Sequence, residues 1–146
     1  YHRAHEDHKA GRGPKPEFDA SLEYLRGLMR HEYPVSVHTQ NYHVVLATIQ
    51  ELRQEFGLWT VIVHGTMDAY PLTGLAAETG VPVCLGPRQF HYDGATSRFI
   101  GLAGVWYRGF DPTGLDLPYP GIRGPQRGLG RDAIAINTDS PVVAQE

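Results

Sequence analysis

The chain has 146 residues, of which 41% are hydrophobic, and its 13 Lys and Arg against 16 Asp and Glu give a formal net charge of −3. This composition suits one folded domain rather than a disordered chain. No basic block interleaved with aromatic residues indicates a nucleic-acid surface, and no apolar stretch approaches the roughly twenty residues of a membrane helix. We therefore expect neither nucleic acid nor a membrane as a partner.

The first sixteen residues are polar and contain no apolar residue that would order them against a core. They read as a charged, exposed helix end followed by a linker rich in Gly and Pro, so we expect the folded domain to cover residues 17–146. His2, His5 and His8 recur at every third position, so an alternative to the exposed helix end is a metal clip, in which these histidines together bind a metal ion. The exposed helix end is the favoured interpretation, because metal ligands need to be positioned by ordered neighbours.

Residues 17–87 alternate between helical and strand patterns. Apolar residues spaced by three and four predict one face of a helix at 17–31 (Phe18, Leu22, Leu25, Met29) and the inner face of a helix at 42–56 (Val45, Ile49, Leu52, Phe56). Leu72, Leu75, Ala76 and Thr79 predict a third helix. Short runs rich in β-branched residues predict buried parallel strands at 35–38, 60–64 and 81–87.

Capping residues set the expected ends of these helices. Pro16 suits the first turn of the first helix, and Asn41 and Asp68 are expected N-caps of the second and third. Gly57 and Gly80 are expected directly after the second and third helices, where a left-handed residue commonly ends a helix.

The alternation of helical and strand patterns does not continue over residues 88–131, which are rich in Gly, Pro and aromatic residues. A short helix is expected at 100–107. This stretch is either a functional lid or a region whose structure the pattern does not predict. A last strand is expected at 133–139. Four strands joined by crossover helices are half of the eight in a (β/α)8 barrel. An open four-stranded sheet would expose apolar edge strands, so we favour an α/β fold that is part of a larger barrel.

Three side chains that can bind a metal lie at the carboxyl ends of the predicted strands, namely His38, His64 and Asp139. Ligands bind beyond the carboxyl ends of parallel strands, so these side chains are expected to converge there. Imidazole and carboxylate groups suit zinc, manganese or iron, and three of them leave a position open for water. Each has a simpler interpretation: a lone strand-end His is more often a hydrogen-bonded core residue, and Asp139 could cap a following helix.

Two further residues are candidates for binding the substrate. Arg88 and His91 follow the strand at 81–87, so both lie where a pocket at the carboxyl ends is expected. Arg88 could hold a substrate carboxylate through a paired contact, although an exposed loop arginine is the commoner case.

These strand ends resemble the later half of the metal-dependent amidohydrolase superfamily, and the imidazolonepropionase-like and prolidase-like groups are the nearest. The resemblance is carried by His38 in Val-His-Thr-Gln, His64 in Val-Ile-Val-His-Gly-Thr and Asp139 in Ala-Ile-Asn-Thr-Asp-Ser-Pro-Val-Val. Glu-Phe-Gly at 55–57, Gly-Val-Pro-Val at 80–83 and Leu-Gly-Pro at 85–87 add to it. It covers roughly residues 18–85 and 133–143 and is weaker between them.

The resemblance implies a partial TIM-type barrel, about strands five to eight of the (β/α)8 fold. His38 and His64 would be metal ligands from the fifth and sixth strands, and Asp139 would end the eighth, touching a metal and shuttling a proton. His64 could instead orient the substrate carbonyl. The complete enzyme would hold one or two divalent ions, with zinc the first choice. Its first-strand His-x-His pair and its bridging fourth-strand Lys or Glu have no counterpart in this chain.

Two hypotheses of different class follow. In the first, the chain is a fragment of a metal-dependent amidohydrolase that hydrolyses C–N bonds of amide, cyclic amide or dipeptide-like substrates with a metal-activated water. In the second, it is a non-catalytic half-barrel that needs the missing N-terminal half, a companion chain or another copy. A carbohydrate or phosphate enzyme rests on fold analogy alone. The compartment is either cytoplasmic or exported, with any signal peptide upstream of this chain.

Overall fold

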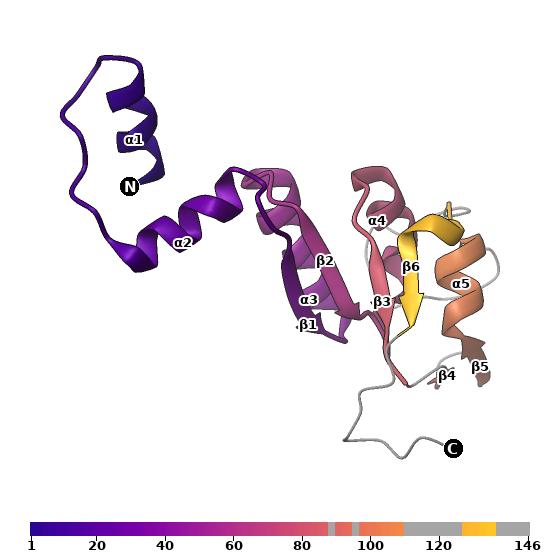
Figure 1. Ribbon diagram of the computed structural model, residues 1–146. Helices are drawn as coiled ribbons and strands as arrows, with labels where there is room; N and C mark the ends of the chain where they lie inside the picture. The colour runs from indigo at the N-terminus through magenta and orange to yellow at the C-terminus, as the bar shows by residue number, and fades with distance from the viewer. Residues whose placement is uncertain (88–89, 95–96, 110–126, 137–146) are drawn as a thin grey trace.

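A computed structural model describes residues 1–87, 90–94, 97–109 and 127–136 (Figure 1). The strands are β1 Val35–Thr39, β2 Thr60–His64, β3 Val83–Leu85, β4 Phe90–Asp93, β5 Arg98–Gly101 and β6 Ile134–Ile136. The helices are α1 His2–Lys9, α2 Ala20–Met29, α3 Tyr42–Ala47, η1 Thr48–Glu55, η2 Tyr70–Leu72, α4 Thr73–Thr79, α5 Leu102–Arg108 and η3 Arg131–Ala133. No helix among these residues is long and apolar enough to span a membrane.

The central element is a four-stranded sheet with the order β1-β2-β3-β6, in which every neighbouring pair is parallel. Helices α3, η1 and α4 provide the crossovers between β1, β2 and β3, as the alternating pattern predicted. The prediction of an α/β fold with four parallel strands is therefore confirmed, and the sheet is compatible with part of a barrel. Its assignment to barrel strands five to eight stays a prediction, as does the domain boundary after residue 16.

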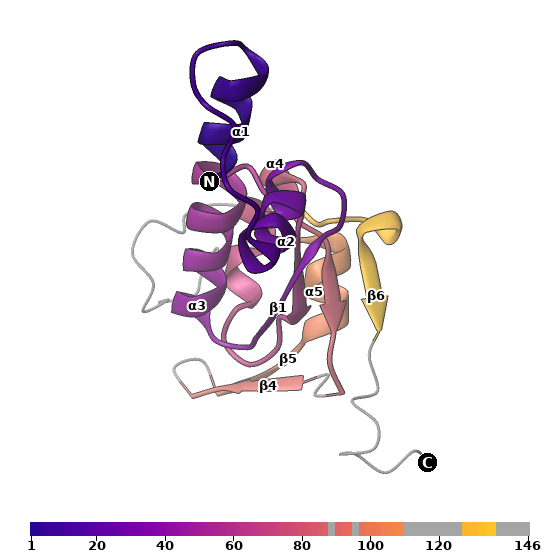
Figure 2. The same ribbon diagram turned by 60° about the vertical axis from the view of Figure 1, so that its left-hand side comes forward.

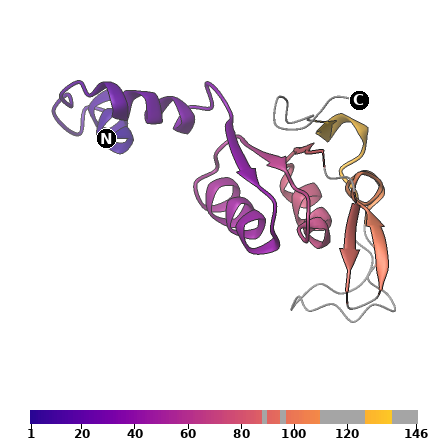
Figure 3. The same ribbon diagram turned by 90° about the horizontal axis from the view of Figure 1, so that it is seen from below.

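The two faces of the sheet differ in burial. Ile62, Val83 and Leu85 point to the face covered by helices, where they are at most 1% exposed and pack with Val45, Ile49 and Trp106. Figure 3 shows the helices that follow β1 and β2 on the same side of the sheet. Residues of the opposite face are only partly buried or exposed; they are Ser36, His38, Val61, Val63, Cys84 and Ala135. We call these the helix face and the open face.

Helices α1 and α2 form an arm that stands away from the sheet (Figures 1 and 3). Asp19, not Pro16, starts α2, because its carboxylate accepts the Leu22 N–H at 2.9 Å. The apolar residues that predicted this helix are exposed: Phe18 76%, Leu22 40%, Leu25 52% and Met29 38%. Ion pairs of Glu23 with Arg26 and Arg30 stabilise the arm and lower the pKa of Glu23 to about 2.

The second helix begins as predicted at Asn41, whose side chain accepts the Val44 N–H at 3.3 Å. It is an α-helix only as far as Ala47 and continues as a π-helix over Thr48–Glu55. The wider π turn changes the angular spacing of the side chains. Val45 and Ile49 are buried as expected, but Phe56 is 53% exposed. The expected inner position of Phe56 is therefore wrong, and the changed periodicity explains why.

The third helix starts differently from the prediction. It opens with the 3-10 turn η2, and its N-cap is Ala69. Asp68 is not its cap; the Asp68 carboxylate instead accepts the backbone N–H of Tyr42 at 2.9 Å, which ties the turn after β2 to the start of α3. The expected left-handed ends are confirmed, with φ of 66° at Gly57 and 68° at Gly80.

The described part of residues 88–131 has more structure than the pattern predicted. Strands β4 and β5 pair antiparallel, and β5 leads directly into α5. The helix expected at 100–107 is therefore a strand as far as Gly101 and a helix from Leu102. The hairpin lies toward the end of the sheet at which the parallel strands terminate (Figures 1 and 2).

Candidate metal-binding site

Two histidines lie at the carboxyl ends of neighbouring strands, His38 in β1 and His64 at the end of β2. His38 pairs in register with Val63 and lies on the open face, where its side chain is exposed. His64 pairs with Thr39, so simple alternation along β2 would direct it to the helix face together with Ile62. The backbone at His64 departs from that alternation.

His64 has a φ of 81°, a left-handed conformation that is uncommon for a residue with a side chain. Rotation about its N–Cα bond redirects the Cβ, and the imidazole reaches the ring of His38. The two ring centroids are 4.2 Å apart, with the ring planes at 79°. His64 is 2% exposed while His38 is open to solvent, so the pair has one buried and one accessible member.

Gly86, directly after β3, lies against the His64 ring. A Cβ at Gly86 would collide with Nδ1 of His64, and the Gly86 N–H donates to the His64 carbonyl at 3.4 Å. A side chain at position 86 would therefore push the imidazole out of its place. Sequence reasoning missed this role of Gly86, because it placed Gly86 inside a strand predicted at 81–87, whereas β3 ends at Leu85.

The paired imidazoles could supply two nitrogen ligands to a divalent cation at the carboxyl ends of the parallel strands. A complete site needs at least one more protein ligand. Among the described residues there is no group of three or more His, Cys, Asp or Glu that could hold a metal. The expected third ligand, Asp139, and the expected substrate residue Arg88 lie outside the described residues.

His91 lies on β4 and its ring packs against Tyr70, with the ring centroids 5.6 Å apart. Tyr70 is 2% exposed, and burial, together with the negative charges of Asp93 and Asp68, raises its pKa to about 12. The phenol therefore stays protonated at neutral pH. Sequence reasoning named His91 but missed Tyr70 and Asp93. The role of His91 in substrate binding stays a prediction.

The three histidines near the N-terminus do not form a metal group within the described residues. His5 lies 3.9 Å from the Glu23 carboxylate, and His8 makes a 3.1 Å hydrogen bond with the Gly13 carbonyl. Partial burial and the nearby Arg26 lower the pKa of His5. The His5–Glu23 contact joins α1 to α2, and the His8–Gly13 bond ties the end of α1 to the segment that follows it.

Comparison with solved structures gives a distant match. No protein-family profile matches the chain, and no curated protein matches it. A solved structure that it matches is that of an amidohydrolase from Thermotoga maritima MSB8, with 30% sequence identity and a TM-score of 0.49. The match covers 58% of this chain and 21% of that chain, so the chain spans about a fifth of the amidohydrolase. The likeness is distant and partial, and it fixes neither substrate nor metal.

Proposed function

We propose that this chain is part of a metal-dependent hydrolase of the amidohydrolase type, in which His38 and His64 are two ligands of a divalent ion, with zinc the first choice. The observation that carries the proposal is the left-handed turn at His64, which brings its ring to 4.2 Å from that of His38. A strained backbone at a non-glycine residue persists where the surroundings hold it, and such residues cluster at functional sites.

The proposed reaction is hydrolysis of a C–N bond in an amide, cyclic amide or dipeptide-like substrate. When bound, the ion would polarise the carbonyl and lower the pKa of a water molecule. Buried His64 would hold a fixed ligand position, while His38 borders the side open to substrate. Asp139, in the role that the resemblance gives it, would accept the proton from water and pass it to the departing amine. His64 has a second possible role, orienting the carbonyl.

The substrate would enter from the carboxyl ends of the strands. His91 belongs to the hairpin that lies toward that end, and Arg88 precedes the hairpin in the sequence. A guanidinium at position 88 would suit a substrate that carries a carboxylate, as dipeptide-like substrates do.

Assay of the zinc-loaded protein against a panel of amides, cyclic amides and dipeptides tests this proposal. We expect turnover of at least one class, and a loss of about a hundredfold or more in His64→Ala and Asp139→Asn. His43→Ala removes an exposed histidine of α3 and serves as the matched control. Turnover that is the same in all four proteins would contradict the assignment of these residues.

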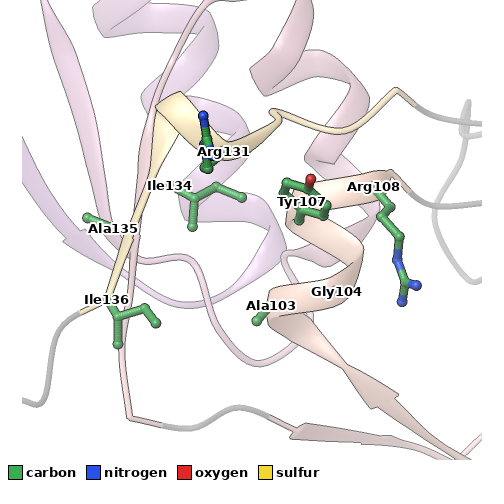
Figure 4. Close-up of a pocket in the computed structure, with 8 residues that line it drawn as sticks. All are labelled: Ala103, Gly104, Tyr107, Arg108, Arg131, Ile134, Ala135 and Ile136. Carbon is green, nitrogen blue, oxygen red and sulfur yellow. The ribbon is translucent and has the colours of Figure 1, made fainter.

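The second candidate function is a non-catalytic half-barrel, and the edges of the sheet favour it. β1 and β6 each have a neighbour on one side only within the described residues. An apolar groove of about 450 Å³ runs between β6 and α5, where Ala103, Ile134 and Ile136 face one another (Figure 4). Light scattering would distinguish the two: a monomer with turnover supports the hydrolase, and an inactive assembly supports the half-barrel.

A further inference from the structure

The turn that redirects His64 continues into Gly65, which also has a positive φ, of 54°. A Cβ at Gly65 would lie 2.8 Å from Cγ1 of Val83 and 3.4 Å from Cζ2 of Trp106. Both the backbone conformation and the space available therefore require glycine at this position. The peptide that joins His64 to Gly65 is packed tightly between β3 and α5.

Hydrogen bonds hold this turn from three sides. The Gly65 N–H donates to the Thr39 carbonyl of β1 at 3.0 Å, and the Gly86 N–H donates to the His64 carbonyl from the β3 side. From the helix side, the indole Nε1–H of Trp106 donates to the Gly65 carbonyl at 2.9 Å. Trp106 is 0% exposed, so this bond lies away from water.

We propose that Trp106 is a positioning residue for the His38–His64 pair: its indole N–H fixes the Gly65 carbonyl and thereby keeps His64 in the left-handed conformation that faces His38. If that hydrogen bond is absent, the carbonyl is a buried acceptor without its partner. The free energy of the turn would then fall if the backbone relaxed to an ordinary extended conformation, in which His64 points to the helix face. The consequence for metal binding rests on the proposed function, whereas the positioning of His64 by Trp106 needs no metal.

Trp106→Phe is the informative variant, because it keeps an aromatic ring and removes the N–H. In the metal-free protein we expect the nuclear Overhauser contact between the His38 and His64 rings to be present in the wild type and lost in the variant. Zinc affinity is expected to fall about tenfold to a hundredfold, the usual effect of losing a group that orients a metal ligand.

Leu102→Ala is the matched control. Leu102 lies on the same helix and is 0% exposed, but its side chain makes no hydrogen bond to Gly65. This variant should lose stability while it keeps the ring contact and the zinc affinity. A Trp106→Phe protein that behaves like Leu102→Ala in both measurements would overturn the positioning role and leave a structural one.

The two proposals fail in different ways. Wild-type protein that does not bind zinc refutes the metal function, whereas the ring contact still decides the role of Trp106. Zinc binding that is equally tight in Trp106→Phe, with the ring contact intact, refutes the positioning role alone.

A measurement on the unaltered protein covers the case in which Trp106→Phe does not fold. The indole N–H of Trp106 should exchange slowly with solvent and more slowly still when zinc is bound, because coupling between two sites is reciprocal. The half-exposed Trp59 provides an internal fast-exchange reference. Exchange of the Trp106 indole as fast as that of Trp59 would overturn the proposal.

Discussion

The helix face and the open face of the sheet are built from the same four strands, yet they differ in burial. Ile62 and Leu85, on the helix face, are 0% exposed, whereas Val63 and Cys84, on the open face, are only partly buried. Burial of apolar surface stabilises the fold at about 25 cal/mol per Å², so most of the packing energy comes from the helix face. The open face leaves its side chains accessible to a substrate or a partner.

His64 links the two faces. Its place in the strand assigns it to the helix face, but its left-handed backbone brings its ring to His38 on the open face. The comparison therefore separates two kinds of residue. Substitutions on the helix face should act on stability, and substitutions around the histidine pair should act on metal binding with a smaller effect on stability.

The largest expected effect comes from Ile62→Ala on the helix face. Removing a fully buried isoleucine should lower the free energy of unfolding by about 2–5 kcal/mol, because it loses apolar burial and leaves a cavity. Val63→Ala, its neighbour on the open face, should cost about 1 kcal/mol. Urea unfolding monitored by circular dichroism measures both. Equal losses would show that the open face is covered in solution.

Gly86→Ala should separate metal binding from stability. The new methyl group would collide with the His64 imidazole, so we expect zinc affinity to fall about tenfold to a hundredfold. Gly94→Ala is the control, because a Cβ there meets no atom of the described residues within 4 Å. Isothermal titration with zinc gives both affinities, and wild-type affinity in Gly86→Ala would refute the close contact.

Tyr70 provides a test by pH, since it lies in the core on the helix side with a pKa raised to about 12. Its ordinary value is about 10, so the neutral phenol contributes stability that is present below pH ~10 and is lost as the pH rises through about 12. Phenolate absorbance should show a late-titrating group that is missing in Tyr70→Phe. Titration of every tyrosine near pH ~10 would contradict its burial.

The smallest effect is expected at Leu25, on the exposed stripe of α2. Leu25→Ala should change the free energy of unfolding by no more than about 0.5 kcal/mol, because its side chain is already 52% exposed. Val45→Ala, in the buried stripe of α3, should cost distinctly more. A loss at Leu25 comparable to that at Val45 would indicate that association covers the α2 stripe.

Sequence reasoning located the strands well because β-branched runs bounded by turn residues are a strong local signal. β1 and β2 match the predicted strands to within one residue. Because the carboxyl ends of parallel strands lie together, His38 and His64 were correctly expected at the same end of the sheet. The left-handed turn at His64 was not predictable in this way. Trp106 and Val83, which lie against this turn, are distant from it in sequence, and only the glycine at position 65 hinted at it.

Other features lacked a local signal or had one that was not used. Helical periodicity predicted both α2 and α3. It does not indicate whether another element covers the apolar face, so the exposure of that face of α2 was not predictable. The π-helix after Ala47 has no recognisable pattern. The β4–β5 hairpin did have one, since Asp93-Gly94 lies between two aromatic strand-forming runs. Asp139 and Arg88 lie outside the described residues, so their roles stay predictions.

Zinc titration of the metal-free protein, with His38→Ala, His64→Ala and the control His43→Ala, tests the central claim most directly. We predict near-stoichiometric binding by the wild type and by His43→Ala. Each of the other two variants should bind at least about tenfold more weakly, because each removes a nitrogen ligand. Absence of zinc binding by the wild type, or unchanged affinity in His38→Ala and His64→Ala, would contradict the assignment of this histidine pair as a metal site.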